Sequence, residues 1–235
     1  MLHGAHPSMQ RNSAIPDSNE SNATEAGWLR LLADRPTWSP ADGPLIVVSP
    51  HPDDEVLGAG GLIHTWAALG RPVTIVSVTD GEAPLPERRR FNLIRREELQ
   101  GALRKLCLTH VAVMRVGLPG GAVARHANRL RNAILALLEP GATLLAPYEH
   151  DGHCDHKAAG EVCCGLGRSH GVTVARFPVG TWSHSVPAAL ISAPWVVFPL
   201  SFEARRAKAH AVQCFASRQP RTVEPFARPY EAFLL

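Results

Sequence analysis

Short apolar runs and segments with helical periodicity alternate along the chain from Leu45 onward. The apolar runs predict strands at Leu45–Ser49, Pro72–Val78, Val111–Val116 and Thr143–Pro147. The segments that follow them predict helices at Glu55–Leu69, Phe91–Leu106, Ala124–Leu138 and His156–Gly167. This alternation is typical of βαβ units, in which helices cover both faces of a parallel sheet. The pattern therefore predicts an α/β fold, a Rossmann-like three-layer αβα sandwich with a mostly parallel sheet.

The segments on either side of this pattern extend the same picture. Residues 1–23 are polar and lack periodicity, which predicts a disordered or loosely attached leader before a single domain at 24–235. A short helix is expected at Glu25–Ala33. Further elements are expected near the end of the chain, with strands at Val172–Val179 and Trp195–Leu200 and a helix at Phe202–Ser217.

Composition and charge exclude several classes of protein. The chain has 235 residues, 45% of them hydrophobic, which suits one α/β domain. The net charge is +3 with scattered basic residues, so we expect no nucleic-acid partner. No apolar run approaches the roughly 20 residues that span a bilayer, so we expect no integral membrane segment. Five cysteines without a CxxC pair, and no signal peptide, predict reduced thiols in a cytoplasmic protein.

Two clusters of potential metal ligands follow predicted strands directly. The first is His51-Pro52-Asp53-Asp54-Glu55, and the second is His150-Asp151-Gly152-His153-Cys154-Asp155-His156. A histidine and a carboxylate three residues later can face one point in a tight loop, and Zn²⁺ accepts both. In open parallel sheets, ligands bind where the loops beyond the carboxyl ends of the strands converge. If the two loops meet, they form a facial His, Asp, His site with an open position and a carboxylate to orient a ring nitrogen.

Each cluster also has a structural interpretation. Acids at 53–55 suit the first turn of a helix, where Asp is a good N-cap, and the histidines at 150–156 suit a solvated loop. Capping does not explain His51, however, and two such clusters at strand ends favour the metal. Glycines at 58, 60 and 61 could indicate a dinucleotide site, but G-x-G-x-x-G would need glycine at Ile63, and the acids would repel a pyrophosphate. We expect these glycines to let the helix pack closely on the sheet.

The same residues resemble a known family. Pro50-His51-Pro52-Asp53-Asp54-Glu55, followed by Leu57-Gly58-x-Gly60-Gly61, resembles the opening motif of the PIG-L/LmbE-like deacetylases. These zinc-dependent enzymes remove the N-acetyl group from glucosamine-containing substrates. Further similarities follow in order at Thr79-Asp80-Gly81-Glu82, Arg95-x-x-Glu98, His153-Cys154-Asp155-His156 and Lys208-x-x-Ala211 with Ser217.

The resemblance implies a role for each motif residue. The ligands of one Zn²⁺ per chain, or of another divalent metal, would be His51, Asp54 and His156. Asp53 would be the general base, and His153 would stabilise the oxyanion or protonate the leaving amine. Asp155 would orient a ligand histidine from behind. Arg95 would contact the sugar, with a solvated helix arginine as the alternative.

The activity implied by the resemblance is hydrolysis of an N-acetylglucosamine-type sugar or glycoconjugate to acetate and a free amine. The alternatives are an amidase acting on another amide such as a thiol conjugate, a nucleotide-binding oxidoreductase, and a noncatalytic binding module. Three residues depart from the family pattern. Cys154 replaces the proline of H-P-D-H, Arg218 replaces a glutamine, and Phe215 stands where histidine or tyrosine is common. These changes affect loop rigidity and substrate contacts more than the metal ligands.

Overall fold

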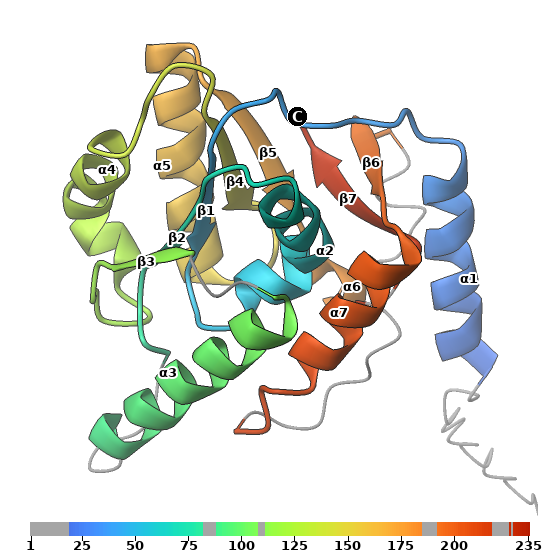
Figure 1. The fold of residues 1–235 in the computed structure, drawn as a ribbon, viewed down its shortest axis with the longest axis horizontal. Coiled ribbons are helices and arrows are strands. Elements are labelled where there is room, and N and C mark those ends of the chain that lie inside the picture. The colour runs from blue at the N-terminus through green and yellow to red at the C-terminus, as the bar shows by residue number, and fades with distance from the viewer. Residues whose placement is uncertain (1–18, 82–87, 108–110, 185–191, 218–225, 227) are drawn as a thin grey trace, which may run out of the picture.

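The protein folds around one seven-stranded sheet, whose place among the helices is seen in Figure 1. The computed structural model describes residues 19–81, 88–107, 111–184, 192–217, 226 and 228–235. The strand order is β3-β2-β1-β4-β5-β7-β6. The strands are β1 (Leu45–Ser49), β2 (Val73–Ser77), β3 (Ala112–Arg115), β4 (Thr143–Pro147), β5 (Thr173–Phe177), β6 (Trp195–Pro199) and β7 (Tyr230–Leu234).

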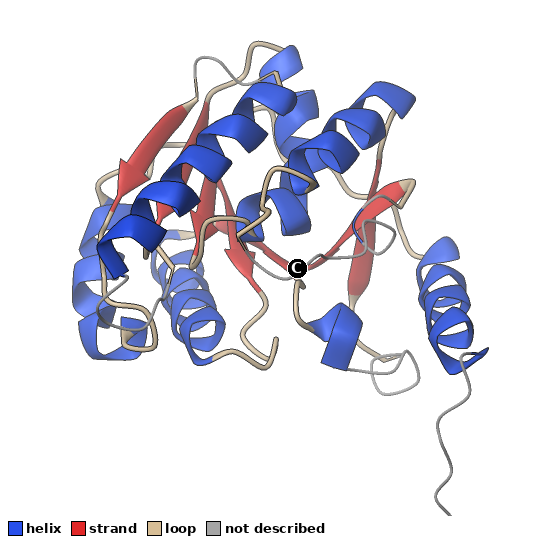
Figure 2. Ribbon diagram, turned by 90° about the horizontal axis from the view of Figure 1, so that it is seen from below, coloured by secondary structure: helices blue, strands red, loops and turns tan. Residues whose placement is uncertain are grey.

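Helices lie on both faces of this sheet (Figure 2). The helices are α1 (Asn19–Ala33), α2 (Asp54–Ala68), α3 (Arg88–Lys105), the 3-10 turn η1 (Val123–His126), α4 (Ala127–Leu135), α5 (Cys154–His170), α6 (Thr181–His184) and α7 (Phe202–Val212). One apolar core joins the sheet to α2, α3 and α7, and a second joins it to α4 and α5. The predicted three-layer αβα sandwich is therefore confirmed.

The position of β1 brings the two predicted ligand loops together. All five residues of β1 are buried, as expected for an apolar strand covered on both faces of a parallel sheet. It pairs in parallel with β2 on one side and with β4 on the other. The strand order reverses between β1 and β4, because β2 and β3 extend the sheet one way and β5 the other. The loops after β1 and β4 therefore leave the same edge side by side, at the switch point where open α/β sheets bind ligands.

The structure differs from the predicted elements in several places. The short helix α6 was not predicted, and the helix predicted at Phe202–Ser217 ends at Val212. Strand β7 was not predicted, and it pairs antiparallel with both β5 and β6. The helix predicted from Glu25 begins at Asn19, so the last residues of the predicted leader are helical, while residues 1–18 lie outside the described residues. The helix predicted at Ala124–Leu138 is divided into η1 and the shorter α4.

The glycines of α2 allow the close packing that the sequence predicts. A Cβ atom at Gly58 would lie 2.1 Å from Cδ2 of Phe177 in β5, and one at Gly61 would lie 2.5 Å from Leu200. The helix is kinked at Ala59, whose φ and ψ are −140° and 16°. After the kink, the backbone N–H groups of Gly61 and Leu62 donate to the carboxylate of Glu231 in β7 at 2.8 and 2.9 Å.

Two further expectations concern the chain as a whole. The cysteines at 107, 154, 163, 164 and 214 are all free thiols, as predicted. Within the part of the chain that the structure describes, none of the helices has the length and apolar character to cross a membrane.

Candidate metal centre

The first ligand loop is a tight turn between β1 and α2. The backbone N–H of His51 donates to Oδ2 of Asp54 at 2.9 Å, and the N–H of Asp54 donates back to the carbonyl of His51 at 3.2 Å. Asp53, between them, has φ 146° and ψ −27°, a conformation that residues with a Cβ rarely adopt. Its side chain forms no capping hydrogen bond with α2. Asp53 therefore occupies the predicted N-cap position of α2, but its side chain does not cap the helix.

The second ligand loop enters α5. His153 is the N-cap residue of this helix, and its Nδ1 accepts a hydrogen bond from the N–H of Asp155 at 3.1 Å. Asp151, Asp155 and His156 are buried, whereas the side chain of His153 is exposed. The solvated-loop interpretation of the histidines is therefore wrong for His156, whereas His150 and His153 are exposed.

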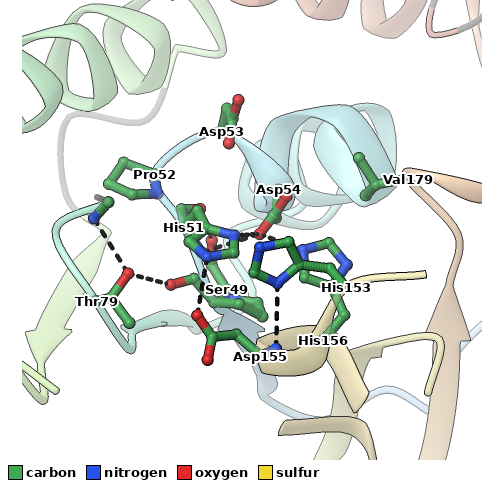
Figure 3. Close-up of polar contacts among 12 residues, drawn as sticks. Ser49, His51, Pro52, Asp53, Asp54, Thr79, His153, Asp155, His156 and Val179 are labelled. Atoms are coloured by element: carbon green, nitrogen blue, oxygen red, sulfur yellow. Dashed lines mark hydrogen bonds and ion pairs between the residues drawn. The ribbon is translucent and has the colours of Figure 1, made fainter. Parts of the chain in front are cut away.

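The two loops meet at the carboxylate of Asp54. Its Oδ2 lies 3.2 Å from Nδ1 of His51 and 3.1 Å from Nε2 of His156 (Figure 3). The three predicted ligands thus present two nitrogens and one oxygen toward a common region. Potential ligand nitrogens of His51, His153 and His156 also lie within 4.8 Å of one another. This donor set of imidazole and carboxylate groups suits a divalent cation such as zinc.

A carboxylate lies beside each of the two histidines predicted to bind the metal. Nε2 of His51 lies 3.2 Å from Oδ2 of Asp155, and Nδ1 of His156 lies 2.8 Å from Oδ2 of Asp151. Such pairs fix the orientation and tautomer of a metal-binding imidazole, and leave its other nitrogen to face the metal. Asp155 thus lies beside His51, and its role in orienting that histidine stays a prediction.

Backbone N–H groups hold both of these carboxylates in place. Asp155 accepts from Gly121 at 2.7 Å and Val123 at 3.2 Å. Asp151 accepts from three consecutive N–H groups, those of Val179, Gly180 and Thr181. Asp151 was missing from the predicted site residues, although its place within the second cluster, five residues before His156, was a usable signal.

The proton affinities of these groups reflect their close packing. Burial alone would lower the pKa of His51, but hydrogen bonds with Asp155 and Asp54 outweigh it and raise the pKa to about 9. Burial would likewise lower the pKa of His156. The charge of Asp54 and the hydrogen bond with Asp151 outweigh burial and raise this pKa to about 10. Burial would raise the pKa of Asp54, yet the two histidines hold it well below its usual value. The centre thus keeps a carboxylate anion between two groups that attract it.

His153 differs from the two buried histidines. Burial and the charges of His51 and His156 lower the pKa of its imidazole, which favours the neutral form. Because Nδ1 accepts the Asp155 N–H, the proton of that neutral ring is on Nε2. The ring lies edge-on to His51, with centroids 4.6 Å apart. His153 therefore offers an N–H donor beside the centre.

Asp53 stands apart from this group in Figure 3. It is fully buried, and its Oδ1 lies 3.2 Å from Nη2 of Arg95 in α3. Arg95 is itself fully buried, so the alternative of a solvated helix arginine is wrong.

Glu55 is not a solvated acid of the first helical turn. Its side chain is fully buried and bonds to Ser49, whose Oγ also lies 2.6 Å from the carbonyl oxygen of His51. Burial raises the pKa of Glu55 to about 7, against the opposing effect of the Ser49 hydroxyl. Glu55 and Ser49 together support the backbone of the first ligand loop from beneath. This role was not predicted, because an acid in the first turn of a helix is usually explained by the helix dipole alone.

Known proteins share parts of this sequence and fold. A 44-residue stretch is 50% identical to the 1D-myo-inositol 2-acetamido-2-deoxy-alpha-D-glucopyranoside deacetylase of Nocardia farcinica (strain IFM 10152), covering 19% of this chain and 15% of that relative. The N,N'-diacetylchitobiose deacetylase of Pyrococcus horikoshii has a similar structure, with a TM-score of 0.58, 19% identity and coverage of 92% of this chain and 86% of that one. The zinc-inhibited form of the teicoplanin deacetylase Orf2 gives a TM-score of 0.60 at 19% identity, covering 74% of this chain and 84% of the other.

The two structural likenesses concern the fold alone, and the Nocardia match covers a small part of that relative. The match to a family model is more extensive. Residues 46–164, more than half of the chain and including both ligand loops, match the PIG-L model, which is described as GlcNAc-PI de-N-acetylase. The chain therefore belongs to the PIG-L family.

Proposed function

We propose that this protein is a zinc-dependent N-deacetylase. Its substrate would be an N-acetylglucosamine-type sugar or glycoconjugate, and its products acetate and a free amine. The observation that carries the proposal is the convergence of His51 Nδ1 and His156 Nε2 on one oxygen of Asp54, at 3.2 and 3.1 Å. Membership of a family of metal-dependent deacetylases supports the same activity.

The metal ligands in this proposal are His51, Asp54 and His156. Each histidine has its second nitrogen on a buried carboxylate, which leaves one nitrogen of each ring for the metal. The two histidines and one carboxylate make a set of three protein ligands, the number that catalytic zinc sites typically use. A zinc ion bound there would activate water and polarise the acetamide carbonyl.

The remaining chemistry is assigned to Asp53 and His153. Asp53 takes the proton from the water whose oxygen attacks the acetamide carbon. Nε2–H of His153 donates to the carbonyl oxygen as it gains negative charge, a type of contact whose loss typically costs about 10²–10³ in rate. When the carbon–nitrogen bond breaks, the amine nitrogen receives the proton that Asp53 took from the water and leaves as the free amine, and acetate remains. The exposed position of His153 supports its role, because its Nε2–H can be reached by a bound substrate.

One pair of measurements tests the proposal. Purified protein is analysed for bound metal, and acetate release is then assayed with zinc supplied against N-acetylated monosaccharides, nucleotide sugars and glycosides. We expect one zinc per chain and acetate from at least one class. Stoichiometric zinc without acetate from any sugar would replace this proposal with an amidase acting on another amide. Protein that binds no zinc would refute the metal centre itself.

A further inference from the structure

Arg95 and Asp53 form an ion pair inside the protein. Neither side chain reaches solvent, and Oδ1 of Asp53 lies 3.2 Å from Nη2 of Arg95. The same Nη2 donates to the carbonyl oxygen of Pro52. A guanidinium ion is costly to bury unless it is paired and hydrogen-bonded, so these contacts account for its position. One nitrogen thus binds both the backbone before Asp53 and the side chain of Asp53.

A second acid and a distant serine hold Arg95 from the other side. Nη1 of Arg95 lies 3.3 Å from Oε2 of Glu98, one turn along α3. Glu98 accepts hydrogen bonds from the backbone N–H and the hydroxyl of Ser217, both at 2.6 Å. Ser217 follows α7, and the ring of Phe215 lies 5.5 Å from the guanidinium carbon. A continuous series of polar contacts therefore runs from Ser217 through Glu98 and Arg95 to Asp53.

The backbone of Asp53 needs such support. Its φ of 146° is unfavourable for any residue with a Cβ, and such conformations persist only where the surroundings fix them. Arg95 contacts the carbonyl of Pro52 and the carboxylate of Asp53, which lie on either side of this torsion angle. Glu55 and the first turn of α2 also hold the Asp53 backbone, but without the guanidinium the carboxylate of Asp53 would lose its cation and shift from its present position.

We infer that Arg95 is a positioning residue that fixes Asp53, with Glu98 and Ser217 fixing Arg95 in turn. This inference rests on the proposed function, in which Asp53 transfers the proton. It differs from the sugar contact that the sequence resemblance implies for Arg95. A fully buried guanidinium whose two terminal nitrogens are engaged by protein oxygens is poorly placed to bind a substrate hydroxyl.

Steady-state kinetics on the zinc-loaded enzyme separate the two roles. A displacement of about 1 Å in a reacting group can cost about 10² in rate, so Arg95→Met should lower kcat by about that factor. Its KM and zinc content should stay close to those of the wild type. Arg95→Lys should recover part of kcat, because an ammonium can reach one of the oxygens. Arg96→Met is the matched control, since Arg96 is the next residue of α3, is partly exposed and bonds to Asp80 instead. A rise in KM at unchanged kcat would assign Arg95 to substrate binding and overturn the inference.

Variants of Glu98 and Ser217, the residues that hold Arg95, extend the test. Glu98→Gln and Ser217→Ala should both lower kcat at constant KM, and Ser217→Ala should have the smaller effect because its backbone N–H still donates to Glu98. These variants also carry the kinetic test if Arg95→Met does not fold. Wild-type kcat in both would show that Arg95 does not depend on them and would overturn that part of the inference.

A measurement without substrate distinguishes this inference from the proposed function. The Tm values of Arg95→Met, Asp53→Asn and the double variant form a double-mutant cycle. We expect the Tm loss of the double variant to be clearly smaller than the two single losses together, because either change alone breaks the pair. If the Tm losses are coupled but the protein releases no acetate, the proposed function is refuted and the ion pair between Arg95 and Asp53 is still supported. Additive losses would refute the pair, whatever the activity.

Discussion

Nδ1 of His156 donates to Oδ2 of Asp151 across 2.8 Å, and the same carboxylate accepts the N–H groups of Val179, Gly180 and Thr181. One buried aspartate thus fixes both a proposed metal ligand and the turn after β5. Asp151 lies five residues before His156, on the loop that enters α5. The orientation of His156 therefore depends on a segment more than 20 residues further along the chain.

Asp151→Asn should weaken metal binding. An amide has one oxygen and one NH₂ group, so it cannot accept from His156 and from the turn as a carboxylate does. Loss of such a partner typically costs about 10–100-fold in metal affinity or activity. Zinc affinity measured by competition with a chelator should fall by this factor. Glu149→Gln is the control, because Glu149 is two residues away and pairs with Arg176 instead. Equal affinities in all three proteins would contradict the role of Asp151.

Changes at His51 and Asp53 should separate metal binding from turnover. His51→Ala removes a ligand and should abolish bound zinc and acetate release together. Asp53→Asn should retain zinc and lose turnover, because the amide cannot take up a proton at neutral pH. Metal analysis and acetate release on the same preparations make the comparison. If Asp53→Asn lost zinc while His51→Ala kept it, the assignments of ligand and base would be reversed.

Removing the metal should lower thermal stability. A ligand that binds the folded state alone stabilises it by about 4 kcal/mol when its concentration is about 1,000 times Kd. Protein dialysed against a chelator should therefore unfold at a clearly lower Tm, and added zinc should restore it. The His51→Ala variant should show no such shift. Equal Tm values for wild-type protein with and without zinc would contradict a site at these residues.

Two glycine substitutions should have opposite effects on stability. An alanine at Gly58 would place its Cβ 2.1 Å from the ring of Phe177, which is fully buried and cannot move freely. Overpacking of this kind typically costs about 1–3 kcal/mol. A Cβ atom added at Gly165, inside α5, would have nothing within 4 Å, so Gly165→Ala should stabilise the protein by about 0.5–1 kcal/mol. Denaturant unfolding measures both, and destabilisation by both would refute the distinction.

The buried pair of Lys208 and Glu231 should matter for stability. Both side chains are buried and in contact, and Glu231 also holds the N–H groups of Gly61 and Leu62. Lys208→Met would leave the Glu231 charge without its cation, which typically costs about 3–5 kcal/mol. Lys157→Met is the matched control, because the Lys157 side chain is 63% exposed. A loss no larger than that of the control would show that the pair adds nothing.

Much of the fold and the centre of the site follow from the order of patterns along the chain. The apolar run before His51 and the one before His150 predict strands, and parallel strands of an α/β sheet present their following loops at one edge. The sequence therefore indicated that the two clusters could meet. The family resemblance then selected His51, Asp54 and His156 from among the acids and histidines, and these three side chains do lie together.

The remaining features depend on contacts that no local pattern encodes. The segment Tyr230–Leu234 alternates too briefly to predict a strand, and its antiparallel place between β5 and β6 is set by packing. Glu55 and Arg95 belong to helices and resemble ordinary surface charges in the sequence, yet both are fully buried. Their burial follows from the close approach of α2 and α3 to the first ligand loop. Asp151 was missed because its partners follow another strand.

The contacts of Glu231 also limit when this protein can finish folding during its synthesis. The N–H groups of Gly61 and Leu62 donate to the carboxylate of Glu231, which lies 170 and 169 residues later in the chain. Before Glu231 leaves the ribosome, the kinked helix that begins with Asp54 lacks this anchor, however complete the strands around it are. We therefore expect a nascent chain arrested before Tyr230 to bind zinc more weakly than the released protein.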